Sequence, residues 1–172
     1  YAAQVESSRR TAFLAAASDQ LSASLDVRQT LQSVVELAVP AVGDWVSVHL
    51  VDEAGAPRLA AVQHRDPEQQ TTLEEVFERY PLDVDGGLGM GLVRAGGRAL
   101  RLREISEPVL QSIARDDVHL QSLRRLGMGS ALRVPLVARG RAFGVLAVAR
   151  AAADAYDDED VAFVEDLAHR MA

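Results

Sequence analysis

The sequence contains no cysteine in its 172 residues. Disulfide bonds, thiolate metal sites and thiol nucleophiles are therefore excluded, because each needs a cysteine sulfur. A chromophore attached through a thioether bond is excluded for the same reason.

The chain also lacks a long apolar run and a clustered basic face. No segment approaches the roughly 20 apolar residues of a membrane-spanning helix, and the amphipathic start does not resemble a signal peptide. The formal net charge is −7, and the 18 basic residues are scattered, whereas nucleic acid phosphates require a basic surface. We expect no nucleic acid partner, no membrane contact in this segment, and a cytoplasmic domain cut from a longer protein.

Signatures of catalysis are absent as well. The sequence has neither the Gly-x-Ser-x-Gly of serine hydrolases nor the His-Glu-x-x-His of zinc proteases, and it has no ATP-binding signature. We therefore predict no catalytic residue and no metal ligand, and we do not expect this segment to be an enzyme.

Two segments imitate ligand-binding motifs. The glycine-rich run 86–91 lacks the preceding strand and the nearby lysine of a phosphate-binding loop. A flexible lid is the simpler interpretation, with anion binding as the alternative. The aspartates of 154–160 lack the glycine and glutamate spacing of a calcium loop, and Asp157 fits better as the N-cap of an acidic helix start.

Apolar periodicity predicts helices at both ends of the chain, with strands between them. Asp26 is a suitable N-cap for a second helix, and Pro40 ends it. Helical spacing is found at 5–24, 26–40, 68–80, 88–95 and 107–126 (with a break near 116–117), and strand patterns at 44–52, 58–64 and 98–103.

In residues 130–148, apolar positions alternate on each side of the turn Arg139-Gly140, which predicts two strands of an antiparallel hairpin. Pro135 has no N–H to donate, so we expect it at a sheet edge or a bulge. A last helix follows the acidic residues 157–160. Because strands and helices do not alternate regularly, the order favours an α+β domain with an antiparallel sheet of about five strands, terminal helices on one face and the middle segment over the other.

Three motifs along these elements are typical of one family. They are Ser130-x-Leu132-x-Val134-Pro135-Leu136 with Gly140 and Gly144-Val145-Leu146-x-Val148, then Tyr156-x-x-Glu159-Asp160-x-x-x-Val164-x-x-Leu167-Ala168, and Asp44-Trp45-Val46-Ser47-Val48-His49-Leu50-Val51-Asp52. With these motifs, residues 20–172 resemble a GAF domain, a small-molecule sensor module of signalling proteins. The resemblance implies a six-stranded antiparallel sheet with a helical bundle on one face and a ligand pocket on the other.

Further motifs resemble a subtype. They are His64-Arg65-Asp66-Pro67, Arg79-Tyr80-Pro81 and Leu123-Arg124-x-Leu126-Gly127-x-x-Ser130. Such motifs are typical of GAF domains in actinobacterial multi-domain regulators, which commonly carry a histidine kinase or a metal-dependent protein phosphatase. The cyclic-nucleotide signature of the family, Asn-Lys-x-Phe-Asp-Glu, is absent, and covalent bilin binding and methionine sulfoxide reduction both use cysteine. A non-covalent ligand, or none, remains.

Polar side chains on otherwise apolar strands are the candidate ligand-binding groups. Ser47, His49, Ser130 and Arg133 would orient a ligand if their face lines the pocket, and Arg133 has the donor fork for a carboxylate or phosphate. The alternative is that this face touches solvent, or that Arg133 pairs with an acidic neighbour.

Two further candidates complete the predicted site. His64, like His49, could hydrogen-bond a ligand or ligate haem iron; the competing interpretation is a solvated or internally bonded histidine, and we expect no haem. Tyr80 is the other candidate.

The terminal helices suggest a role in signalling. The last helix repeats Val161, Val164, Leu167, Ala168 and Met171 at helical spacing, and residues 5–21 are similarly striped. We expect residues 1–20 to be a signalling helix preceding a domain at 21–172, and a homodimer through the terminal helices. Two hypotheses therefore stand: a ligand sensor, or a ligandless dimerisation and signal-transmission module.

Overall fold

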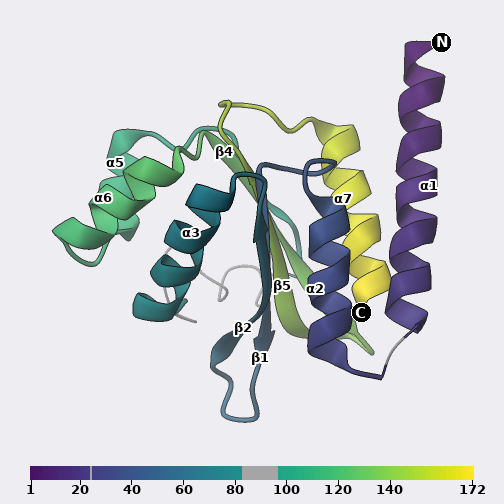
Figure 1. Cartoon of the computed structure of the whole chain (residues 1–172), viewed down its shortest axis with the longest axis horizontal. Helices are drawn as coiled ribbons and strands as arrows, with labels where there is room; N and C mark the ends of the chain where they lie inside the picture. Colours follow the sequence, from purple (N-terminus) through teal and green to yellow (C-terminus); the bar gives the residue numbers. More distant parts are fainter. Residues whose placement is uncertain (24, 83–96) are drawn as a thin grey trace.

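A computed structural model describes residues 1–23, 25–82 and 97–172. The predicted lid at 86–91 and the predicted short helix at 88–95 lie outside these residues. The described chain forms three layers, with a central sheet between two groups of helices (Figure 1).

Within the described residues, the sheet has five antiparallel strands in the order β2-β1-β5-β4-β3. Their bounds are β1 Trp45–Val51, β2 Pro57–His64, β3 Leu100–Leu102, β4 Ser130–Ala138 and β5 Arg141–Arg150. Both predicted hairpins are present. The five strands of the described residues confirm the expected antiparallel sheet of five to six strands. The predicted strand 98–103 is shorter than expected, because only its three central residues pair with β4.

One helical layer consists of α1 (Ala2–Ser22), α2 (Val27–Ala38) and α7 (Asp158–Met171). As predicted, Asp26 caps α2, its side chain accepting the Gln29 N–H, and α2 ends before Pro40. Asp157 and Asp160 form a reciprocal capping box at the start of α7, with the acidic first turn that the helix dipole favours. The first helix begins three residues earlier than the predicted start at residue 5.

The second helical layer consists of α3 (Pro67–Arg79), α5 (Glu107–Ile113) and α6 (Asp117–Leu126). The predicted helix 107–126 is interrupted as expected, because Asp116 is extended and caps α6 by accepting the His119 N–H. Gly127 ends α6 in the left-handed conformation, with φ +65°.

Pro135 lies in β4 beyond the point where β3 pairs with it, since Leu100 is opposite Arg133. A register shift follows at Leu136/Val137. The expected position at an edge or bulge therefore fits the described strands.

Alternation along the strands gives the sheet two apolar faces. Val46, Val48, Leu132 and Leu146 join the main core beneath α1, α2 and α7, whereas Trp45, Val62 and Ala147 join a second core beneath α3 and α6. None of the helices that the structure describes combines the length and the hydrophobicity needed to span a lipid bilayer.

Candidate functional site

A cavity of about 460 Å³ lies between the second helical layer and the sheet. This volume is within the range of small-molecule sites. Its lining comes from the sheet and from α3, α5, α6 and their connections: Trp45, Ser47, Leu73, Val76, Phe77, Tyr80, Leu82, Ser112, Ile113, Arg115, His119, Leu123, Leu126, Met128, Arg133 and Ala147.

The floor of the cavity is set by strand register. Ser47 on β1 and Arg133 on β4 are both opposite Ala147 on β5, so the three residues form one row across the sheet. Neighbouring strands lie about 4.8 Å apart, which places the outer two Cα atoms roughly 10 Å apart. The small side chain of Ala147 leaves the space between Ser47 and Arg133 open.

Polar atoms at this floor and beside it are buried without partners. The Nε1 of Trp45, the Oγ of Ser47, the Nδ1 of His49 and the Nε of Arg133 have no hydrogen-bond partner within the described residues. Ser47 is 0 % exposed and Trp45 6 %. A buried polar group without a partner lowers the stability of the fold by about 1–3 kcal/mol. A cluster of such groups at the floor of a cavity is therefore more typical of a ligand site than of a structural core.

Arg133 is the charged group of this floor. Burial lowers the pKa of its guanidinium, and the structure gives it no ion pair with any described carboxylate. The alternative that Arg133 pairs with an acidic neighbour therefore has no support in the described part of the chain.

His49 lies in the neighbouring row, where its ring meets Phe77 edge-on at 4.9 Å. It is 2 % exposed. Burial, with a smaller contribution from the nearby Arg133 charge, lowers the pKa of His49 to about 4. His49 is therefore neutral at physiological pH, and it does not compete with Arg133 for an anion.

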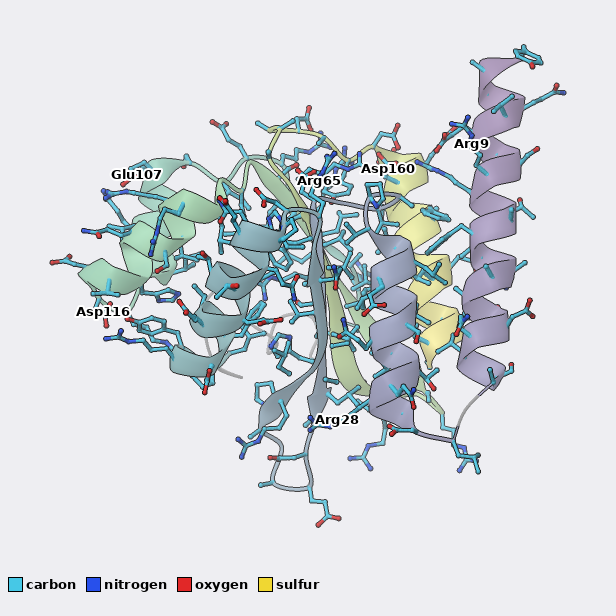
Figure 2. The ribbon with its side chains drawn as sticks, viewed as in Figure 1. Arg9, Arg28, Arg65, Glu107, Asp116 and Asp160 are labelled. Atoms are coloured by element: carbon cyan, nitrogen blue, oxygen red, sulfur yellow. The ribbon has the colours of Figure 1, made fainter. Side chains whose placement is uncertain are left out.

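The helical wall carries a second set of polar side chains, around Tyr80. The Tyr80 hydroxyl donates to Asp116 Oδ1 at 2.7 Å, and the Tyr80 ring stacks on the His119 ring at a centroid distance of 4.0 Å. Hydrogen bonds from Tyr80, and then from the His119 N–H, lower the pKa of Asp116. Asp116 lies at the outer end of the α5–α6 pair (Figure 2), so this network fastens α6 to the end of α3.

The structure brings three of the six predicted site residues to the cavity: Ser47, Tyr80 and Arg133. His49 is next to it, behind Phe77. Hence the expectation that this strand face could simply touch solvent does not hold for Ser47 and His49, which are buried.

His64 and Ser130 are placed elsewhere. His64 Nδ1 accepts the Asp66 N–H at 2.9 Å in the turn before α3, the internally bonded alternative. Ser130 Oγ donates to the Ala152 carbonyl at 2.7 Å and accepts the Ala155 N–H at 3.3 Å. Both residues hold backbone, and neither is among the lining of the cavity.

Sequence reasoning missed Trp45, Phe77, Arg115 and His119 as lining residues. Trp45 is two residues from Ser47, so strand alternation already places them on one face. His119, Leu123 and Leu126 share one face of α6 at helical spacing. No comparable signal in the sequence indicates that Phe77 and Arg115 face the same space.

The described ranges contain no group of three or more histidine or carboxylate side chains placed to hold a metal ion. The cavity instead offers a largely apolar wall, a few convergent donors and, at its floor, an arginine whose Nε is buried. This arrangement can bind a small molecule and orient it by its polar end.

The sequence model of the GAF domain family matches residues 26–172. The chain belongs to the GAF domain family. GAF domains are typically sensory or regulatory modules. Among curated proteins, none shows significant similarity to the sequence.

Solved structures share the fold of this GAF domain. The GAF domain of a phosphoenolpyruvate-protein phosphotransferase from Coxiella burnetii has 21% identity and a TM-score of 0.71 over 94% of this chain and 89% of that one. The corresponding domain from Acinetobacter has 19% identity and a TM-score of 0.69 over 95% and 90%. A free methionine-R-sulfoxide reductase from Neisseria meningitidis, solved with its substrate, has 19% identity and a TM-score of 0.66 over 94% and 85%. The fold therefore occurs both in domains of larger proteins and in enzymes.

Proposed function

We propose that this GAF domain is a non-catalytic small-molecule sensor of a bacterial signal-transduction protein. The observation that carries the proposal is the cavity of about 460 Å³ with unpartnered polar atoms at its floor. A domain with a purely structural role would gain stability by filling such a space with side chains. The absence of cysteine removes the chemistry that the resemblance assigns to sulfoxide-reducing GAF domains.

A continuous set of contacts supports coupling between the cavity and the terminal helices. Arg133 is opposite Leu100 of β3. The next β3 residue, Arg101, donates to the Tyr156 carbonyl and pairs with Asp158 at 3.0 Å, at the start of α7. A ligand that favours one position of β3 and β4 would thereby favour one position of α7.

α7 in turn lies beside α1, and the two helices run parallel. Arg10 pairs with Asp160 at 2.6 Å, and two turns further Arg170 donates to Ser18 Oγ at 2.9 Å. Figure 1 shows α1 as the outermost helix of this layer, with α2 and α7 between it and the sheet. We propose that ligand binding shifts the packing of α7 against α1, and that this shift is the output.

The motifs at 64–67, 79–81 and 123–130 support the proposal that the domain comes from an actinobacterial-type cytoplasmic regulator. A histidine kinase or a metal-dependent phosphatase is the output domain that the resemblance implies.

The homodimer through the terminal helices stays a prediction. Phe13, Leu14 and Leu21 of α1 pack against the core of the same chain. This packing explains the apolar stripe of α1 without a second copy of the chain. The exposed surface of α1 is the face left for a dimer contact.

Native mass spectrometry of freshly purified protein tests the sensor function. We expect a co-purifying small molecule that is released on unfolding and is missing from Ala147→Leu, whose larger side chain fills the floor. Arg141→Gln, an exposed position on β5, is the matched control and should retain the molecule. The bare protein mass in every preparation would favour the ligandless module.

A further inference from the structure

The charged residues in the described lining of the cavity are all of one sign. Its described lining contains Arg115 and Arg133 but neither aspartate nor glutamate, although the whole chain carries a net charge of −7. Arg115 donates to the Pro81 carbonyl, whereas Arg133 has no partner in the described chain. Within the residues that the structure describes, this acidic protein thus offers no carboxylate to the arginine at the floor of its cavity.

Resting on the proposed function, we propose that the ligand is a small monocarboxylic acid with an apolar body, whose carboxylate is held by Arg133. The guanidinium presents two parallel N–H groups that match the two oxygens of a carboxylate. Ser47 Oγ and Trp45 Nε1, both buried without partners, are further donors on the same face of the sheet. The ligand would satisfy all three side chains together.

The register of the sheet explains how one anionic group reaches these donors. Ser47 and Arg133 flank Ala147 in one row, and Trp45 is opposite Ala149 in the next. Ala147 lies between Ser47 and Arg133, and Ala149 lies beside Trp45. Both side chains are small, so they leave room above the middle of the floor. A carboxylate seated over Ala147 therefore lies between Ser47 on one side and Arg133 on the other.

The number of charges at the floor favours a carboxylate over a phosphate. Arg133 supplies one positive charge, and His49 is neutral. A carboxylate cancels that charge in a site of low dielectric constant, whereas a phosphate dianion would leave a buried negative charge unpaired. The charge of a carboxylate is thus balanced by Arg133 without a further positive group such as a helix N-terminus.

The remaining wall selects the body of the acid. Above the floor, apart from Ser112, Arg115 and the polar group around Tyr80 and His119, the lining is aliphatic and aromatic, from Leu73, Val76, Phe77, Ile113, Leu123, Leu126 and Met128. Burying an aromatic or branched aliphatic group there gains about 25 cal/mol for each Å² of apolar surface. Small hydrophilic acids lack that gain and should bind more weakly.

Calorimetry with matched probes tests this inference. The probes are phenylacetate and 4-methylpentanoate, their neutral amides, and phenyl phosphate, each titrated into the whole chain after any co-purified molecule has been removed. We expect each acid to bind roughly 10- to 100-fold more tightly than its amide, as a charge-assisted hydrogen-bond pair would give. We expect phenyl phosphate to bind more weakly than phenylacetate.

Variants locate the effect. Arg133→Met should lower the affinity for both acids to that for their amides, and Ser47→Ala should reduce it by less. Arg141→Gln, which removes an arginine from the same hairpin outside the cavity, should leave the affinity unchanged.

Amides that bind as tightly as acids, or acids that bind Arg133→Met as tightly as the parent, would overturn the inference but leave the proposed sensor function in place. Acids, amides and phosphate that all fail to bind, in a protein that also carries no co-purified molecule, would overturn both.

A measurement without ligand gives a second, independent test. If Arg133 awaits an anion, its guanidinium is desolvated without a partner in the free protein. Arg133→Met removes that desolvation cost and should therefore raise the Tm by about 2 °C or more. An arginine with a structural role would instead give a lower Tm in Arg133→Met, and that result would contradict the proposal.

Discussion

At the residue scale, polar side chains on the sheet beneath α3 lose their hydration on folding and gain no hydrogen bond from the described chain in return. Ser47 and His49 are buried on strands and Arg133 is half-buried. The described chain offers no hydrogen-bond partner to Ser47 Oγ, His49 Nδ1 or Arg133 Nε. Each unpaired group opposes folding. Residues of this kind persist where a ligand can satisfy them, which links the local chemistry to the proposed sensing role.

Stability should depend on pH through His49. Its pKa is about 4 in the folded chain against an ordinary value of 6.5, so the unfolded chain binds more protons between these two pH values. Stability should therefore fall as the pH falls from 6.5 to 4, with His49 contributing on the order of 3 kcal/mol over the full window. Urea unfolding at a series of pH values measures this slope.

His49→Gln, which cannot titrate, should show a shallower loss of stability over the same pH window. Some slope should remain, because burial also lowers the pKa of His64 and of His119. His169→Gln on the exposed side of α7 is the control and should behave like the parent. Equal slopes in His49→Gln and the parent would contradict the assigned environment.

Strand alternation shows how far residue-level prediction could go. It places Ser47 and His49 on one face of β1, and the cavity is on that face. The same alternation separates Ser130 from Arg133, because residues three apart on a strand point to opposite faces. The prediction grouped them as pocket residues, whereas Ser130 supports the segment that leads to α7.

At the element scale, Ser130 fixes the connection between β5 and α7. Its hydroxyl bonds the Ala152 carbonyl and the Ala155 N–H from a position that is 1 % exposed. Ser130→Ala leaves both backbone groups unsatisfied and should lower the free energy of unfolding by about 1–3 kcal/mol. Chemical denaturation measures this loss.

A comparison with Ser47→Ala separates the two roles of serine in this domain. Ser130→Ala should lower stability and leave the affinity for phenylacetate unchanged, whereas Ser47→Ala should lower affinity with little loss of stability. The reverse pattern would mean that Ser130, not Ser47, contacts the ligand.

The ends of the helices are the features of the fold that the sequence predicts best. Asp26, Asp157 and Gly127 act locally, so their types predict the caps that the structure contains. The cavity depends on α3, α5 and α6 crossing one face of the sheet. That crossing is set by long-range packing, and therefore Phe77 and Arg115 could not be recognised.

At the scale of the whole molecule, the ion pair between Arg10 and Asp160 joins the outermost helix to the rest of the fold. Arg10 also lies over the Phe163 ring at 4.8 Å. Arg10→Met should lower stability by about 1–2 kcal/mol and increase amide exchange along α1. Asp160 and Arg9 are labelled in Figure 2.

Arg9→Met is the matched control for this change, because Arg9 is the exposed neighbour of Arg10 on the same helix. It should leave α1 exchange unchanged. If neither Arg9→Met nor Arg10→Met changes exchange along α1, the pair between Arg10 and Asp160 does not hold this helix.

Oligomeric state is also a property of the whole molecule. A homodimer through the terminal helices predicts twice the chain mass of 18.5 kDa in light scattering of the intact chain. A monomer mass at all accessible concentrations would refute the dimer, although the pocket and its ligand would be unaffected.

Hydrogen exchange with and without ligand tests the central claim most directly, namely that the occupied cavity alters the packing of α7. The measurement compares the free protein with protein saturated by the tightest-binding acid of the probe series, in the parent and in Arg133→Met. We expect slower exchange in α3 and α6 around the cavity, and changed exchange in the first turn of α7 and the facing part of α1, with both effects lost in Arg133→Met. Protection confined to the cavity, with α7 and α1 unchanged, would contradict the account of this domain as a sensor.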